Sequence, residues 1–194
     1  MIYGIDTFGY HDVLEIAKDP SKAKLSEKSI EQIIKSHQNV QKIVASDRTV
    51  YGINTGFGPL CDTKISESET AQLQHNLIIS HAVGVGKPID KMISKIMMIS
   101  KIHALSKGFS GVSLEVIERL ILMLEKDIIP VVPEQGSVGA SGDLAPLAHL
   151  VLPLLGLGLV WENNKTVGSS SVLEKHNIQP LKLGPKEGLG LING

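Results

Sequence analysis

The sequence predicts a mainly α-helical fold, and three observations support that prediction. Aromatic residues make up only 4% of the 194 residues, and alternating runs of β-branched residues are rare. Apolar residues instead recur at the spacing that places them on one face of a helix. Residues that favour helix starts precede several of these periodic stretches. A chain of this length is long enough to enclose one sizeable core.

Capping residues predict where the first four helices begin. Ser29 with Gln32 and Ser66 with Glu69 have the spacing of a capping box, in which two side chains satisfy the free amides of a first turn. Asp90 and Ser113 are single capping residues before apolar stretches. The expected helices cover residues 29–45, 66–80, 90–108 and 113–124.

Prolines and asparagines predict the local structure of the second half. Pro130 and Pro133 require an extended stretch, because proline cannot continue a helix. A fifth helix begins at Asp143, and Pro146 is tolerated in its first turn. Asn163-Asn164 favours the turn of a small β hairpin. The hairpin strands are expected at residues 159–161 and 166–167, and a further short helix at 171–175.

Composition and motif spacing argue against several classes of function. The net charge is −1 with both signs interspersed, which argues against a nucleic-acid partner. Cys61 is the only cysteine, so no internal disulfide can form, and no set of residues has metal-ligand spacing. The N-terminus lacks the pattern of a signal peptide, and the apolar run 144–159 is broken by Pro153 and by glycines. We therefore expect a cytoplasmic protein with no membrane partner.

The most informative run is Gly-Ser-Val-Gly-Ala-Ser-Gly-Asp-Leu-Ala-Pro-Leu-Ala-His-Leu, residues 136–150. It joins a glycine-rich turn to a helix start, with Ala140, Ser141 and Gly142 at the junction. Glycine allows the backbone to fold back, so that the Gly142 nitrogen could reach the Ala140 carbonyl carbon. Cyclisation with loss of two waters would give a ring with an exocyclic alkene, which is a strong electrophile. The run resembles the signature of the aromatic amino acid ammonia-lyases.

That resemblance implies a cofactor and the residues that form it. Members of the family build 4-methylideneimidazol-5-one (MIO) from Ala-Ser-Gly, which here corresponds to Ala140, Ser141 and Gly142. Asp143 follows directly, and its place in the family implies an aid to cyclisation; the residue also has the character of an N-cap. The positive end of the following helix would draw electrons out of the ring. The resemblance implies no external cofactor.

Three further segments also match the family. Tyr51-Gly-Ile-Asn-Thr-Gly-Phe-Gly58 resembles a loop that covers the active site, and this implies that Tyr51 is the base for the β-proton of the substrate. The run 76–86 includes Ser80-His81, and this pair resembles the histidine-specific branch of the family. An imidazole substrate needs a partner that can donate or accept a hydrogen bond, and His81 can do both. Asn193 matches an asparagine close to the ring and the substrate amine.

The resemblance implies an ammonia-lyase that converts L-histidine to trans-urocanate and that assembles as a homotetramer. Within the family, a tyrosine or phenylalanine ammonia-lyase or an aminomutase is the alternative. A non-catalytic helical module is the alternative of another class. We expect residues 1–194 to be the N-terminal, MIO-bearing domain, truncated before a central helical bundle. The apolar end of the chain, from Glu187 onward, prompts that expectation. On its own, this part is expected to be inactive and to leave the ring unformed.

Overall fold

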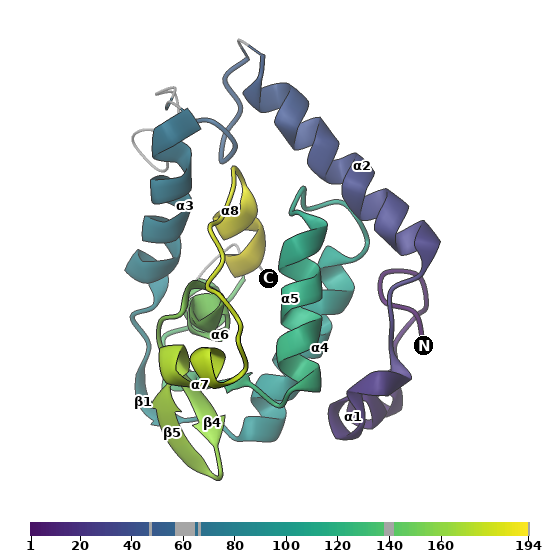
Figure 1. Ribbon diagram of the computed structural model, residues 1–194, viewed down its shortest axis with the longest axis vertical. Coiled ribbons are helices and arrows are strands. Elements are labelled where there is room, and N and C mark those ends of the chain that lie inside the picture. Colours follow the sequence, from purple (N-terminus) through teal and green to yellow (C-terminus); the bar gives the residue numbers. More distant parts are fainter. Residues whose placement is uncertain (47, 57–64, 66, 138–141, 194) are drawn as a thin grey trace.

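The computed structural model describes residues 1–46, 48–56, 65, 67–137 and 142–193, and it is mainly helical (Figure 1). Short strands and 3-10 turns connect the helices. The helices are α1 (Tyr10–Lys18), α2 (Glu27–Val44), α3 (Glu67–His81), α4 (Lys91–Leu105), α5 (Leu114–Glu125), α6 (Leu144–Val151), α7 (Ser169–Lys175) and α8 (Glu187–Ile192). The 3-10 turns are η1 (Pro20–Lys22) and η3 (Leu152–Leu155). The predicted fold class is confirmed.

The core is one continuous cluster of apolar side chains that extends from Tyr3 to Ile192. Helices α4 and α5 pack against each other near its centre, and α1 packs on α4 (Figure 1). The inward faces of these two central helices are fully buried. Their buried side chains include Met98, Ile99, Ile102, Ile117, Leu120, Met123 and Leu124. The apolar spacing noted in the sequence therefore forms the centre of the protein.

Helix α2 begins earlier than its predicted capping box. Ser26 is the N-cap, because its hydroxyl accepts a hydrogen bond from the Ser29 amide at 3.2 Å. Ser29 instead lies within the first turn and is fully buried, where its hydroxyl donates to the Tyr3 carbonyl at 2.9 Å. The prediction of Ser29 as the cap was therefore wrong. The capping pair is Ser26 with Ser29, not Ser29 with Gln32.

Other helix starts agree with the sequence to different degrees. Asp90 caps α4, since its Oδ1 accepts a hydrogen bond from the Met92 amide at 2.7 Å. Ser113 has the N-cap position of α5 but its side chain makes no capping hydrogen bond. Its amide instead donates to Glu187 Oε1 at 2.8 Å, which connects α5 to α8. For α3, the helix begins at Glu67 as expected, and Ser66 lies outside the described residues.

The described strands form two small antiparallel sheets. The predicted hairpin is present as β4 (Leu159–Glu162) and β5 (Lys165–Gly168), turned by Asn163 and Asn164 at positive φ angles of 50° and 60°. Strand β2 (Ile129–Pro130) adds to this hairpin beside β4. Strand β3 (Pro133–Gln135) pairs with β1 (Val85–Pro88), so the extended proline stretch contacts the turn that follows α3.

The apolar segment from Glu187 onward is part of the core. Glu187 is buried and accepts hydrogen bonds from the Gly184 and Ser113 amides, so its carboxylate holds the start of α8. Leu191 and Ile192 are almost completely buried. The segment therefore packs against the described part of the chain, although Lys186, the N-cap residue of α8, makes no capping hydrogen bond with its side chain.

Candidate active site

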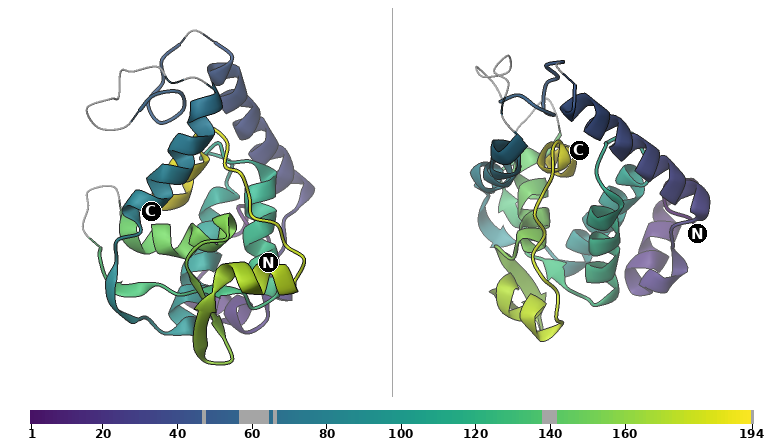
Figure 2. Two further views of the ribbon diagram at one scale, coloured as in Figure 1. Left: turned by 60° about the vertical axis from the view of Figure 1, so that its left-hand side comes forward. Right: turned by 45° about the horizontal axis from the view of Figure 1, so that its top comes forward.

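Helices α3, α6 and α8 contact one another pairwise, and each carries a sequence-predicted site residue at or beside one end. His81 ends α3, Gly142 and Asp143 precede α6, and Asn193 follows α8. Both views of Figure 2 show α8 against α3, although more than a hundred residues separate the two helices in the chain. The fold therefore brings three of the predicted segments into one packed unit.

The glycine-rich segment meets α6 through a backbone conformation that favours glycine. Gly142 has a backbone φ angle of +90°, which residues with a side chain rarely adopt. Its carbonyl accepts a hydrogen bond from the Leu144 amide at 3.1 Å, which forms the entrance to the helix. Ala140 and Ser141 lie outside the described residues. The residue at the cyclising position and the positive helix end beside it are compatible with the expected ring.

Asp143 has the position of an N-cap, but its side chain makes no capping hydrogen bond. Its carboxylate instead accepts a hydrogen bond from the Ser137 hydroxyl. Ser137 and Asp143 lie on the two sides of the segment that contains Ala140 and Ser141. The contact therefore ties together the two ends of the cofactor-forming segment.

His81 has a defined tautomer. Its Nδ1 lies 2.8 Å from the Leu77 carbonyl one turn earlier in α3. Because a carbonyl can only accept, Nδ1 carries the proton, and in the neutral ring Nε2 is then an acceptor. The Ser80 hydroxyl also donates to the Leu77 carbonyl, at 3.1 Å. The imidazole of His81 is therefore oriented by its own helix.

Asn193 is fixed at the end of α8 by both its backbone and its side chain. Its amide and its Nδ2 both donate to the Leu189 carbonyl, at 3.2 Å and 2.7 Å. Its carbonyl accepts a hydrogen bond from Nζ of Lys101 on α4. Burial lowers the pKa of Lys101 to about 8, because the charged ammonium is disfavoured away from water.

Tyr51 lies in the turn that follows α2, outside the three-helix unit, and its side chain is 55% exposed. Asn54 holds the turn: its Oδ1 accepts from the Val50 amide and its Nδ2 donates to the Arg48 carbonyl, both at 2.8 Å. Gly52 has a φ angle of +72°, as the turn requires. The end of the predicted loop, residues 57 and 58, lies outside the described residues.

His149 makes a contact that the sequence did not predict. Its Nε2 accepts a hydrogen bond from the Gly84 amide at 3.0 Å, which joins α6 to the turn after His81. Burial lowers the pKa of His149 below its ordinary value. A Cβ at Gly84 would lie 3.1 Å from the His149 ring and from the Gln135 carbonyl. No local pattern indicates this contact, because its partners are far apart in the chain.

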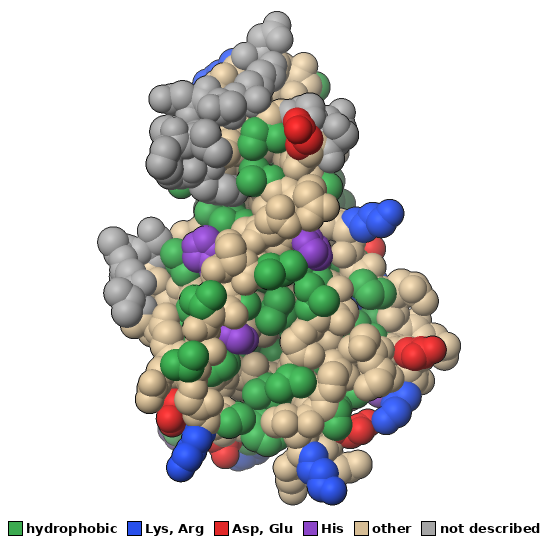
Figure 3. All heavy atoms as spheres, turned by 90° about the vertical axis from the view of Figure 1, so that its left-hand side faces the viewer, with side chains coloured by type: hydrophobic (Ala, Val, Ile, Leu, Met, Phe, Trp, Pro, Cys, Tyr) green, Lys and Arg blue, Asp and Glu red, His purple; other side chains and the backbone are tan. Residues whose placement is uncertain are grey.

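The face that carries α3 has few charged side chains at its centre (Figure 3). Figure 3 shows hydrophobic and histidine side chains gathered on the central part of this face, with charged side chains mostly toward its lower edge. Within the described part of the chain, no group of three histidine, cysteine or acidic residues is arranged to hold a metal ion. No helix among the described residues is both long and apolar enough to span a bilayer.

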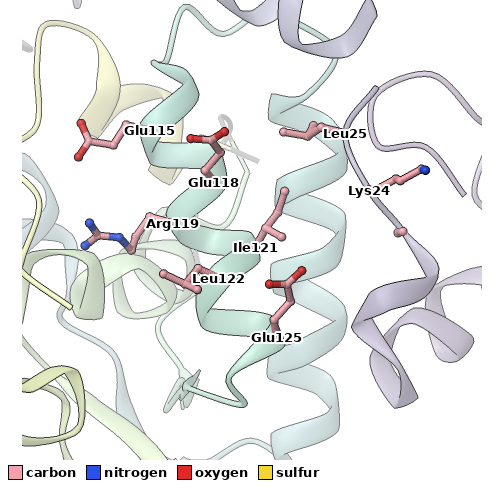
Figure 4. Close-up of a pocket in the computed structure, with 9 residues that line it drawn as sticks. Lys24, Leu25, Glu115, Glu118, Arg119, Ile121, Leu122 and Glu125 are labelled. Atoms are coloured by element: carbon pink, nitrogen blue, oxygen red, sulfur yellow. The ribbon is translucent and has the colours of Figure 1, made fainter. Parts of the chain in front are cut away.

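A surface groove lies away from the candidate residues. Figure 4 shows its lining: Glu115, Glu118, Arg119 and Glu125 project from α5, with Glu115 and Arg119 on the side away from Lys24 in this view. None of the predicted site residues lines this groove. The groove is rich in carboxylates and does not meet the glycine-rich segment, so it is not the candidate active site.

Known proteins resemble this chain along nearly its whole length. A sequence model of the aromatic amino acid lyase family matches residues 8–194. The chain is 49% identical over 183 residues to histidine ammonia-lyase of Bacillus subtilis (strain 168), which covers 94% of the chain and 36% of that protein. It is 53% identical over 173 residues to histidine ammonia-lyase of Shouchella clausii (strain KSM-K16), which covers 89% of the chain and 35% of that protein. The chain thus spans little more than a third of these relatives.

Solved structures share the fold. Histidine ammonia-lyase from Trypanosoma cruzi superposes with a TM-score of 0.89 at 34% identity, covering 100% of this chain and 37% of that one. Tyrosine aminomutase from Streptomyces globisporus superposes with a TM-score of 0.91 at 32% identity, covering 100% of this chain and 36% of that one.

Proposed function

Because the chain belongs to the aromatic amino acid lyase family, we propose that it forms the cofactor-bearing part of a histidine ammonia-lyase. The reaction is the non-oxidative elimination of ammonia from L-histidine to give trans-urocanate. The identity of about half of all aligned residues to two histidine ammonia-lyases supports this proposal. The contacts of α6 with α3 and α8, the helices that end at or beside His81 and Asn193, also support it.

The observation that carries the choice of a polar substrate ring is the orientation of His81. With Nδ1 donating to the Leu77 carbonyl, Nε2 is the atom that can accept a hydrogen bond from an imidazole N–H. A phenyl side chain has no such donor. This acceptor therefore favours a substrate ring that carries a hydrogen-bond donor over phenylalanine. A tyrosine hydroxyl could also donate to it, and the identity to two histidine ammonia-lyases favours histidine.

The cofactor proposed for this site is MIO, formed from Ala140, Ser141 and Gly142. When formed, it supplies an electrophile that takes up electron density from the substrate. Asn193 would support the ring oxygen through its side-chain amide. Asp143, held by Ser137, would keep the two ends of the segment together during cyclisation. The positive φ angle of Gly142 is the feature of this segment that supports the assignment.

Proton removal from the substrate is assigned to Tyr51. Its turn places the side chain largely in solvent in this structure, and an active-site role requires the loop to face the substrate. Two hydrogen bonds between the Asn54 side chain and the backbone fix this turn, so the backbone that carries the Tyr51 phenol has a defined conformation. The proposed base abstracts the β-proton, which is the proton lost in the elimination.

The remaining groups of the site are proposed to lie outside residues 1–194, since these residues span 36% of a relative's length. We propose that these residues are the N-terminal, cofactor-bearing domain of a cytoplasmic homotetramer. Closing the ring requires a strained backbone that surrounding packing must hold, at about 1–3 kcal/mol for each distorted residue. The 194 residues on their own are therefore expected to leave the segment uncyclised and to be inactive.

A tyrosine-directed lyase or aminomutase is the second candidate, favoured by the structural similarity to tyrosine aminomutase. The test is to offer L-histidine, L-tyrosine and L-phenylalanine separately to the protein that contains this chain, and to identify every product. Urocanate and ammonia from histidine alone support the proposal. Turnover of tyrosine or phenylalanine in preference to histidine, or a β-amino acid product, would support the second candidate. Absence of turnover with all three would favour a non-catalytic helical module.

A further inference from the structure

Lys101 is a buried cation whose partner is a backbone carbonyl. Its side chain lies on α4, and the residue is only 6% exposed. Its Nζ donates to the carbonyl of Asn193. Among the residues that the structure describes, no carboxylate forms an ion pair with this ammonium. A buried charge without a counter-ion is unfavourable, so its hydrogen bond to Asn193 must offset part of that cost.

Asn193 is the residue that this contact holds in place. Its amide and its side-chain Nδ2 are both directed at the Leu189 carbonyl, and its own carbonyl is directed at Lys101. These contacts use one hydrogen of Nδ2, and its second hydrogen is the donor that would reach the ring oxygen. Lys101 and Asn193 also line the same surface hollow, together with Lys186 and Phe109. The asparagine is therefore held at the edge of an open space.

We propose that Lys101 is a positioning residue for the reaction, which acts by fixing the backbone of Asn193 at the end of α8. This inference rests on the function proposed above, in which Asn193 supports the ring. A hydrogen bond from a charged donor is stronger than one between neutral groups. Without it, one end of Asn193 would be held only by the turn that begins at Leu189.

The positioning role can be separated from a structural role, because the two make opposite predictions for stability. The lowered pKa of Lys101 means that the unfolded chain binds its proton more tightly than the folded protein does. Lys101 therefore weakens the fold below pH 8, and replacing it with the apolar stem of methionine removes that penalty. We expect Lys101→Met to leave the urea midpoint at neutral pH unchanged or raised while activity falls.

The experiment is a double-mutant cycle in the protein that contains this chain, with Lys101→Met, Asn193→Ala and both changes together. Lys101→Met should lower kcat by about ten-fold to about a hundred-fold, the scale of a small displacement of an active-site group. In the Asn193→Ala background, Lys101→Met should have almost no further effect, since there is no side chain to position. Additive losses in the double variant would overturn the proposal.

Lys95→Met is the matched control, because Lys95 is on the same helix but pairs with Asp127 at 2.7 Å. It should leave kcat unchanged; a loss equal to that of Lys101→Met would assign the effect to α4 as a whole and overturn the proposal.

Hydrogen exchange gives a readout that needs no turnover. The amide of Asn193 should exchange faster in Lys101→Met but not in Lys95→Met, and unchanged exchange in both would overturn the proposal. If the unaltered protein fails to release ammonia from histidine, the proposed function fails, and the exchange measurement still tests the contact.

Discussion

The backbone amide of Gly84 donates a hydrogen bond to Nε2 of His149 at 3.0 Å, and this contact joins the turn after α3 to α6. Close packing reinforces it, because a Cβ on Gly136 would lie 2.9 Å from the Gly84 Cα. Gly84 lies three residues after His81, and Gly136 lies between β3 and the segment proposed to form the cofactor. One side chain therefore joins the turn that follows His81 to the helix that follows the glycine-rich run.

The Gly84 to His149 contact should make stability depend on pH. Nε2 of His149 can accept the hydrogen bond from the Gly84 amide only while the ring is neutral. Burial lowers the pKa of His149 in the folded protein. The unfolded chain therefore binds the proton more readily, so this contribution is fully present above about pH 6.5 and is lost as the pH falls through the folded pKa. His103 has a pKa lowered mainly by burial and accepts from the Gly4 amide, so it adds an effect of the same sign.

Two variants of His149 separate the charge from the hydrogen bond. His149→Gln keeps an acceptor and does not titrate, so urea unfolding should show near-normal stability at neutral pH with a weaker loss in acid. His149→Leu removes the acceptor, and should cost about 1–3 kcal/mol at neutral pH because the Gly84 amide loses its partner. Equal pH dependence in the unaltered protein and in both variants would show that His149 does not control this effect.

Gly188 should be essential for the approach of α8 to α3. A Cβ at this position would lie 2.7 Å from the Gln74 carbonyl, which belongs to the backbone and cannot move aside. Gly188→Ala should therefore lower the free energy of unfolding by about 1–3 kcal/mol, despite the better helix propensity of alanine. Gly168→Ala is the control, since apart from its chain neighbours no atom of the described residues lies within 4 Å of a Cβ at Gly168. Equal stabilities of the two variants in urea would contradict this packing.

Replacing His81 should change which substrate is preferred. His81→Phe and His81→Leu both remove the Nε2 acceptor, and the loss of a hydrogen-bond partner typically costs roughly 1–3 kcal/mol. The ratio of kcat/KM for L-histidine to that for L-phenylalanine should fall by about ten-fold or more. Ser80→Ala, at the adjacent position, should leave that ratio nearly unchanged. A histidine preference that survives in both His81 variants would place this residue outside the substrate pocket.

Removing the Tyr51 hydroxyl should affect the chemical step more than binding. Tyr51→Phe changes only that group, so kcat should fall by a factor on the order of 100 or more, while KM changes little. The variant should also show a primary isotope effect with β-deuterated histidine at least as large as that of the unaltered enzyme. If kcat is preserved, Tyr51 is a packing residue of its loop.

The sequence was sufficient for elements that local chemistry determines. Asp90 caps α4 and Asn163-Asn164 turns the hairpin as predicted, because both depend on neighbouring backbone groups. The start of α2 was misplaced because Ser29 also satisfies the capping pattern. In the folded protein its hydroxyl is used by the carbonyl of Tyr3, which lies far away in sequence. Helix α1 and the pairing of β1 with β3 were not predicted at all.

Among the site residues too, those with a local motif were predicted and those that depend on distant contacts were not. The segments of His81, Gly142 and Asn193 were recognised from their local motifs, and the fold packs the helices that carry them together. The roles of Lys101 and His149 were not predictable, since each depends on one backbone group at a distant position. A lysine in an apolar helix has no sequence pattern that distinguishes a buried ammonium from a solvated one. Such contacts emerge only after the helices are packed.

The central claim is that Ala140, Ser141 and Gly142 form the electrophile, and one mass measurement tests it most directly. Trypsin releases these residues in a single peptide from Asp127 to Lys165, because no lysine or arginine lies between them. In protein active on histidine, this peptide should be lighter than its sequence mass by two waters. Ser141→Ala should abolish both that loss and turnover, while the free energy of unfolding changes by less than about 1 kcal/mol. A peptide of full sequence mass in active protein would contradict the account.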